Sequence, residues 1–350
     1  MRNGQDVSNL DPMVQPREDV AMPETATYRE AISRAIGDEM RADPRVLILG
    51  EDIGESEGPL KTTMGLHKEF GPQRVRDTPI AEEAFVGAAL GLAVAGYRPV
   101  VEIMFADFLG VCFDQIVNCI AKHHFMSGGR MHAPLVIRAI GGGGLRFGPQ
   151  HSQTGESWLL NVPGLRIVAA SAPDEAYGMI RAAIRDPDPV IVLEHKALLG
   201  TKGPVIFGEA GIRDLEAPRV VAAGEHVTIV ASLAMVPRAL DAARQLAGSG
   251  ISAEVIDIRV LRPLNAQLIV DSVKKTSRLL TVEEQGVHGG WGSNIVAEVV
   301  QQAFEYLDAP PIRIGLPDSP LPYSPPIEDH AIPSVERIAQ VTRELIGRSI

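Results

Sequence analysis

The residues best suited to chemistry lie where a helix is expected to begin. Thr78 is a suitable N-cap and Pro79 suits a first helical position, which predicts a helix with Glu82 and Glu83 in its first turn. A carboxylate at that place is either a partner for the helix dipole or a group that takes part in a reaction. The residue types alone leave both interpretations open.

Small residues dominate the rest of this helix and include Gly87 and Gly91. Glycine inside a helix costs about 1 kcal/mol relative to alanine. We therefore expect another backbone to pack closely against this face, which makes it a natural place for subunits to meet.

A histidine in a polar loop is the second candidate. His151 lies between Gln150 and Ser152, after four glycines at 141–144. The glycines fit neither nucleotide-binding pattern, because G-x-G-x-x-G would need glycine at Arg146 and no Gly-Lys-Ser/Thr follows. We predict a mobile loop here. Histidine suits proton transfer near neutral pH, although an isolated loop histidine is commonly an ordinary surface residue.

Two further histidines, His123 and His124, are adjacent near the end of a helix predicted at 109–126. Neighbouring helical positions point about 100° apart, so this pair is poorly placed to bind one ion. We expect both at the surface or in a subunit contact.

Alternating apolar strands and helices must position these residues. The pattern predicts a doubly wound parallel sheet, whose strands end in the loops that carry the candidates. In the first half the expected strands are 46–49, 100–104, 134–138, 165–168 and 190–194, and in the second half 227–230, 253–258, 279–283 and 311–314.

The chain divides into four predicted parts. Residues 1–24 are polar and proline-punctuated and are expected to be a disordered tail. An α/β domain at 25–200 is followed by a glycine- and proline-rich linker at 201–225 and a smaller α/β domain at 226–350.

Composition excludes several classes of protein. A formal net charge of −11 disfavours nucleic-acid binding, and no apolar run is long enough for a membrane span. The start of the chain lacks the apolar core of a secretory signal. Two cysteines are too few for a zinc site or iron–sulfur cluster by themselves, so we expect a reducing cytoplasm.

Several motifs in order resemble one family. Thr78-Pro79-Ile80-Ala81-Glu82 is similar to a segment in beta subunits of the thiamine diphosphate-dependent, decarboxylating component of 2-oxo acid dehydrogenase complexes. The resemblance extends from about 25 to 347 and includes 150–153, 257–264, 282–284 and 322–333. It implies a transketolase-type pyrimidine-binding domain followed by a transketolase C-terminal-type domain.

The same resemblance implies roles for individual residues. Glu82 would hydrogen-bond the cofactor's pyrimidine and promote removal of a proton from its thiazolium carbon. Phe108 would stack on the pyrimidine, with Met104 and the backbone of Ile80 nearby. His151 would face the substrate and the incoming lipoyl group.

A cation loop is implied in addition. The run 183–189 resembles a loop that binds a structural monovalent cation such as K⁺. The expected ligands, largely backbone carbonyls, are Leu135, Ala183, Asp186 and Asp188, where Asp188 replaces an asparagine found in relatives. A helix end without any ion remains the alternative.

The sequence predicts only half of a cofactor site. Diphosphate is usually bound through Mg²⁺ on a Gly-Asp-Gly loop, and the nearest string, Gly37-Asp38-Glu39, lacks the second glycine. We therefore expect an alpha subunit, in an α₂β₂ assembly, to supply Mg²⁺ and the diphosphate half. A lipoyl acyltransferase is the expected second partner.

The implied reaction is oxidative decarboxylation of a 2-oxo acid, with pyruvate favoured, and reductive acylation of a lipoyl group. Acetoin cleavage is an alternative, since Asp107 and Glu194-His195-Lys196 look equally like that branch. A branched-chain 2-oxo acid dehydrogenase and a non-catalytic scaffold subunit are further alternatives. A nicotinamide dehydrogenase is disfavoured by the missing glycine fingerprint.

Overall fold

The computed structural model describes residues 22–348, and most of the tail predicted at 1–24 lies outside them. Glu24 already belongs to a strand, β1 (Glu24–Thr27), which pairs antiparallel with β8 (Lys202–Val205). None of the helices within these residues is long and apolar enough to cross a membrane.

The first half forms a seven-stranded sheet, and the predicted parallel α/β class is confirmed. Its order is β12-β6-β7-β5-β4-β2-β3, and every pairing is parallel except that of β12 with β6. The strands are β2 (Val46–Gly50), β3 (Val75–Asp77), β4 (Arg98–Ile103), β5 (Val136–Gly141), β6 (Arg166–Ala169), β7 (Val190–His195) and β12 (Val260–Arg262).

The second half forms a five-stranded sheet in the order β14-β13-β10-β11-β9, with only β9 antiparallel. Its strands are β9 (Arg219–Ala222), β10 (Val227–Ala231), β11 (Ala253–Asp257), β13 (Leu279–Gly286) and β14 (Ile312–Leu316). The segment predicted as a linker thus contributes β8 to one sheet and β9 to another. Edge strand β12 comes from the second half yet completes the first sheet.

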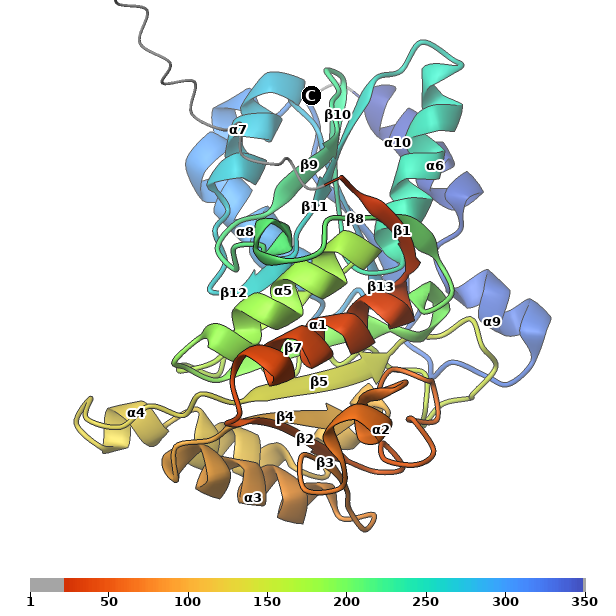
Figure 1. Ribbon diagram of the computed structural model, residues 1–350. Helices are drawn as coiled ribbons and strands as arrows, with labels where there is room; N and C mark the ends of the chain where they lie inside the picture. Colours follow the sequence, from red (N-terminus) through yellow and green to blue (C-terminus); the bar gives the residue numbers. More distant parts are fainter. Residues whose placement is uncertain (1–21, 349–350) are drawn as a thin grey trace, which may run out of the picture.

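Helices pack between and around the sheets (Figure 1). In the first half they are α1 (Tyr28–Ala42), α2 (Leu66–Phe70), α3 (Glu82–Val94), α4 (His123–Met126) and α5 (Pro173–Arg185). In the second half they are α6 (Met235–Ala247), α7 (Gln267–Thr276), α8 (Gly292–Ala303), α9 (Pro325–Ala331) and α10 (Val335–Ile346). One buried apolar cluster includes residues of α1, α5, α6 and β10, so the two halves share a core.

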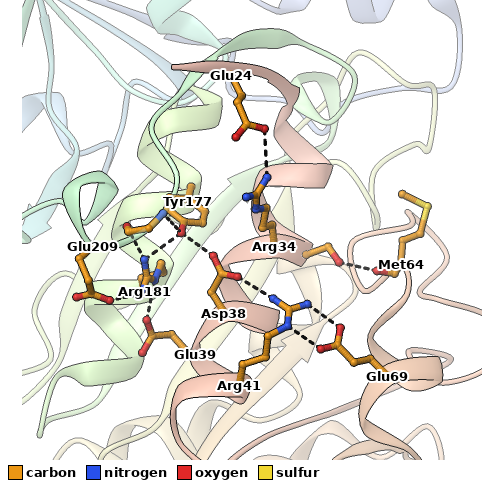
Figure 2. Close-up of polar contacts among 12 residues, drawn as sticks. Glu24, Arg34, Asp38, Glu39, Arg41, Met64, Glu69, Tyr177, Arg181 and Glu209 are labelled. Carbon is orange, nitrogen blue, oxygen red and sulfur yellow. Dashed lines mark hydrogen bonds and ion pairs between the residues drawn. The ribbon is translucent and has the colours of Figure 1, made fainter. Parts of the chain in front are cut away.

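Helix α1 lies beside α5 and is joined to it by polar contacts (Figure 2). Thr27 caps α1 in a capping box with Glu30, as the helical pattern predicts. Arg181 of α5 donates to Glu39 at 2.6 Å, and the Tyr177 hydroxyl donates to Asp38 at 2.6 Å. Asp38, in the string closest to a Gly-Asp-Gly loop, is therefore a structural residue within a helix.

The prediction of one regular helix at 109–126 is wrong, because this region forms several short helical segments. Residues Ala106–Gly110 form a 3₁₀ helix, Gln115–Ile120 a π-helical turn, and only His123–Met126 an α-helix. The Ala121 amide donates to the carbonyl of Ile116, five residues earlier, which widens the turn. Gly164 packs directly against the Ala121 carbonyl, so a neighbouring loop crosses where a regular helix was expected.

Candidate functional site

Glu82 is the first residue of α3, three positions later than the helix start predicted at Pro79. The predicted N-cap role of Thr78 and first-turn role of Pro79 are wrong. The Thr78 amide donates to the carbonyl of Gly50 at 2.9 Å, which continues the pairing of β3 with β2. The strand pairing therefore continues to Thr78, the chain bends at Ile80, and α3 begins only after Ala81.

The Glu82 side chain is buried, with 6% of its surface exposed, whereas Glu83 is exposed. Both line an open pocket of about 550 Å³ with 81, 84, 87, 111 and 115. Ile80, just before this pocket, is 85% exposed. A buried acid beside an exposed apolar residue indicates a surface that another group covers.

A second acid belongs to this region and was not predicted from the sequence. Glu51 follows β2, and its pKa is raised by burial and then by the nearby negative charge of Glu82. Its Oε1 atom is buried without a hydrogen-bond partner in residues 22–348, and Thr78 Oγ1 shares that condition. The position of Glu51 after a strand of a parallel sheet was the signal that could have identified it.

The close packing expected at the two helix glycines is present only in part. A Cβ at Gly87 would lie 3.1 Å from the Gln115 side chain, so a side chain packs there, although no second backbone does. At Gly91 nothing in the described chain comes within 4 Å. At Gly91, therefore, the face of α3 is left uncovered by residues 22–348.

His151 lies in an aromatic cluster formed by residues after β4. Its ring centroid is 4.7 Å from that of Phe105 and 5.4 Å from that of Phe108, both in edge-on arrangements. Met104 immediately follows β4 and is half-buried. The structure therefore brings Phe108 together with His151, two residues far apart in the chain.

Lys196 contacts two members of this cluster, Phe105 and His151, and was not predicted as a site residue. Its Nζ donates to the His151 carbonyl at 2.7 Å and lies 5.5 Å from the Phe105 ring centroid. Burial lowers the pKa of Lys196 to about 8, while the negative charges of Asp107, Glu284 and Glu328 oppose that shift. The sequence signal was its place directly after β7.

An ion network ties together the strands that lead into these loops. Arg138 of β5 donates to Glu102 of β4 at 2.6 Å and to Glu194 of β7 at 2.7 Å. All three side chains are buried. These hydrogen bonds satisfy the buried charged groups of all three residues. They therefore hold three adjacent strands, β4, β5 and β7, in register.

The glycine loop predicted to be mobile is anchored by the second half of the chain. The Gly143 amide donates to Glu284 at 2.6 Å, and the Gly144 amide donates to Glu328 at 2.9 Å. His195 lies 3.1 Å from Glu284 through Nε2, and its Nδ1 accepts from the Ala197 amide, so Nε2 carries the hydrogen. These contacts position the segment that leads to His151.

The four predicted cation ligands lie together, but their groups are already engaged. The Leu135 carbonyl accepts from Val190 at 3.1 Å, and the Ala183 carbonyl accepts from Asp186 at 3.3 Å. Arg98 donates to the Asp186 carbonyl at 3.2 Å, which places a positive charge at the expected site. The Asp188 carboxylate instead contacts His132 at 3.0 Å. The fit to a monovalent cation is incomplete.

Comparison with known proteins matches both halves. Residues 24–202 match the transketolase pyrimidine-binding domain family, and residues 216–338 match the transketolase C-terminal domain family. A solved split-gene transketolase, an inactive beta4 tetramer, has a TM-score of 0.75 and 25% identity, covering 92% of this chain and 99% of that one. The predicted transketolase-type, two-domain fold is confirmed.

Curated relatives are similar along almost the whole chain. The mitochondrial pyruvate dehydrogenase E1 component subunit beta-1 of Arabidopsis thaliana is 42% identical, over 96% of this chain and 94% of that protein. The beta subunit of an acetoin:2,6-dichlorophenolindophenol oxidoreductase of Cupriavidus necator is 44% identical, over 92% of this chain and 98% of that protein. The chain therefore belongs to the transketolase-like family of pyruvate and acetoin dehydrogenase beta subunits.

Proposed function

We propose that this chain is the beta subunit of a thiamine diphosphate-dependent 2-oxo acid dehydrogenase that uses pyruvate and requires an alpha subunit for activity. The observation that carries the proposal is Glu82, a buried carboxylate at the mouth of an open pocket at the start of α3. Its surroundings distinguish it from its exposed neighbour Glu83.

The residues present fit the pyrimidine half of the cofactor. Two buried polar atoms near Glu82, Glu51 Oε1 and Thr78 Oγ1, have no partner within residues 22–348 and are available to a polar ligand. Phe108 and Met104, which follow β4, supply aromatic and apolar surface. Thiamine diphosphate supplies the nucleophilic carbon and the electron sink that decarboxylation of a 2-oxo acid requires.

Glu82 would bind a pyrimidine ring nitrogen through its carboxylate. A negative charge there stabilises positive charge on the ring, and partial burial strengthens that interaction by excluding water. The raised pKa of Glu51 keeps this second acid closer to its neutral form.

His151 would act on the substrate and the lipoyl group. The Lys196 ammonium fixes its backbone carbonyl, and the Phe105 and Phe108 rings restrict its imidazole. A positioned imidazole can donate a hydrogen bond to developing negative charge on a substrate oxygen. We assign His151 to the acyl-transfer half of the reaction and Glu82 to cofactor activation.

An alpha subunit would bring Mg²⁺ and the diphosphate-binding half, in an α₂β₂ assembly. The side chain of Asp38, the nearest candidate here, is engaged with Arg41 and Tyr177 (Figure 2). The exposed Ile80 and the uncovered face of α3 at Gly91 are surfaces suited to such a partner. The lipoyl acyltransferase, the cytoplasmic location and the monovalent cation remain parts of the proposal.

Acetoin is the second candidate substrate. The 44% identity to an acetoin oxidoreductase beta subunit favours it, as does Lys196, which belongs to the Glu194-His195-Lys196 run and contacts the His151 segment. The proposed cofactor and the proposed alpha-subunit partner would be the same for acetoin and for pyruvate.

Co-expression with an alpha subunit of the same family tests the proposal. The purified assembly should decarboxylate pyruvate in a thiamine diphosphate- and Mg²⁺-dependent manner, measured with an artificial electron acceptor. Parallel assays with branched 2-oxo acids and acetoin identify the substrate. The isolated beta chain should bind the cofactor poorly, and tight Mg²⁺-dependent binding in calorimetry of that chain alone would contradict the half-site assignment.

A further inference from the structure

Three side chains of types that commonly bind metals come together at the surface, and one of them, Asp188, also belongs to the predicted cation loop. They are His124 of α4, His132 in the following loop, and Asp188 in the turn between α5 and β7. One possible ligand atom from each lies within 4.8 Å of those from the other two. The two segments are more than fifty residues apart in the chain, so only the fold creates this cluster.

The hydrogen bond of His124 prepares its ring for a metal. Nδ1 lies 3.0 Å from the Met131 carbonyl oxygen, which can only accept. Nδ1 therefore carries the hydrogen, and the lone pair remains on Nε2. Metal-binding histidines commonly donate their other ring N–H to a carbonyl in this way, because it fixes both the tautomer and the ring orientation.

His132 and Asp188 are already spaced like two ligands of one ion. His132 Nδ1 lies 3.0 Å from Asp188 Oδ1. Two ligands at ~2.0–2.1 Å from a tetrahedral zinc ion lie about 3.3 Å apart, so only a small adjustment is needed. The His124 and His132 rings stack at 4.5 Å between centroids, which keeps both imidazoles on one side of the site.

We propose that His124, His132 and Asp188 bind a divalent transition-metal ion of the zinc type. Two neutral imidazoles and one carboxylate suit Zn²⁺ and also Co²⁺ or Ni²⁺, and three protein ligands leave a position for water or a partner's group. The His132 and Asp188 side chains are about half exposed, at 49% and 50%, so an ion can enter without deep desolvation. The ion would fasten α4 to the α5–β7 turn.

This assignment refines the expectation for the histidine pair. His123 and His124 do not share the cluster, in agreement with their divergent directions on a helix. His124 instead finds its partners on other segments. The site depends on imidazole and carboxylate side chains, whereas the predicted monovalent-cation site uses backbone carbonyls, so the two are chemically separable.

Zinc binding to the assembled alpha–beta protein tests the proposal. After chelator treatment and dialysis, calorimetry with Zn²⁺ alone should show one more site per beta chain in the wild type than in the double variant His124→Ala/His132→Ala. Asp188→Asn should weaken this site by at least the ~10- to 100-fold that loss of an outer-shell partner costs, because it removes the anionic ligand itself. His330→Ala, an exposed histidine of α9, should leave it intact.

Two additional measurements separate binding from folding effects. Co²⁺ should give the visible absorption of a four-coordinate site in the wild type and in His330→Ala, but not in the double variant. Zn²⁺ should raise the unfolding temperature of the wild type and of His330→Ala but not that of the double variant, while all of these proteins unfold at similar temperatures in chelator. Equal stoichiometry and equal thermal response in the wild type and the double variant would overturn the proposal. Neither result depends on the proposed enzymatic activity.

Discussion

The two proposed catalytic residues lie in contrasting surroundings. His151 is enclosed by groups of its own chain, namely Phe105, Phe108 and Lys196. Glu82 instead lines an open pocket beside Ile80, whose side chain is 85% exposed. Under the proposed function, the His151 region is built from one subunit, whereas the alpha subunit would cover the Glu82 pocket.

Glu82→Gln should give the largest effect on this comparison. The substitution keeps the shape of the side chain but removes the negative charge that stabilises a protonated pyrimidine. We expect turnover of the assembled enzyme to fall about 10²- to 10⁴-fold with little change in KM for the substrate. Proton exchange at the thiazolium carbon, followed by NMR, measures the affected step.

Glu83→Gln is the matched control, because Glu83 is the next residue of the same helix and is exposed. It should retain near-normal exchange and turnover. An equal defect in both variants, or normal exchange in the Glu82 variant, would show that the wrong carboxylate has been assigned.

His151→Ala should affect the enclosed region alone. We expect acyl transfer to lipoyl protein to fall about 10²-fold, since one positioned acid–base group contributes about this much. Cofactor affinity, measured by calorimetry of the assembly, should remain near the wild-type value. Loss of cofactor with normal turnover at saturation would instead place His151 in the pyrimidine pocket.

Lys196→Met tests how the enclosed region is held. A hydrogen bond to a charged group contributes roughly 1.5–3 kcal/mol, so misplacement of His151 should cost about tenfold in acyl transfer. Because the pKa of Lys196 is lowered to about 8, the ammonium loses its proton as pH rises through that value. The wild-type rate should therefore decline there, and this limb should be absent from the variant's pH profile.

Glu283→Gln extends the comparison to a buried acid that is expected to be neutral in the folded protein, whereas Glu82 acts through its negative charge. Burial raises the pKa of Glu283 from 4.5 to about 8, so the folded protein holds a proton that the unfolded chain releases at lower pH. The stabilising contribution of this group is present below about 4.5 and is lost as pH rises to about 8. Calorimetry of the assembly should show a smaller loss of unfolding temperature over this range in the variant. An unchanged slope would mean that Glu283 is ionised in the folded state.

The sequence predicted every parallel strand except β3, because each of the others is a short apolar run between turn signals, whereas Val75-Arg76-Asp77 is short and polar. It misplaced the start of α3, since pairing of the Thr78 amide with Gly50 overrides the capping preference of Thr78. It missed the amphipathic helix α10 entirely, although Ser334 caps it through its side chain. A regular helix at 109–126 was expected because local periodicity carries no information about the loop at Gly164.

Candidate-site residues were found from the sequence where a motif carried them and missed where tertiary contacts create them. Glu82, His151 and Phe108 came from ordered motifs. The raised pKa of Glu51 comes from burial and from the charge of Glu82, which are tertiary effects. Lys196 matters because the fold brings its ammonium to the His151 carbonyl. The cluster of His124, His132 and Asp188 joins segments whose proximity no local pattern encodes.

The placement of β12 has a consequence for how the chain folds during its synthesis. This strand completes the edge of the first sheet by pairing with β6, yet it follows β10 and β11 of the second sheet in the chain. While the ribosome is still translating the second half, β6 presents an unpaired edge, which is a template for pairing between chains. The interval before residue 262 emerges is therefore the time at which a nascent chain is most exposed to aggregation and has most need of a chaperone.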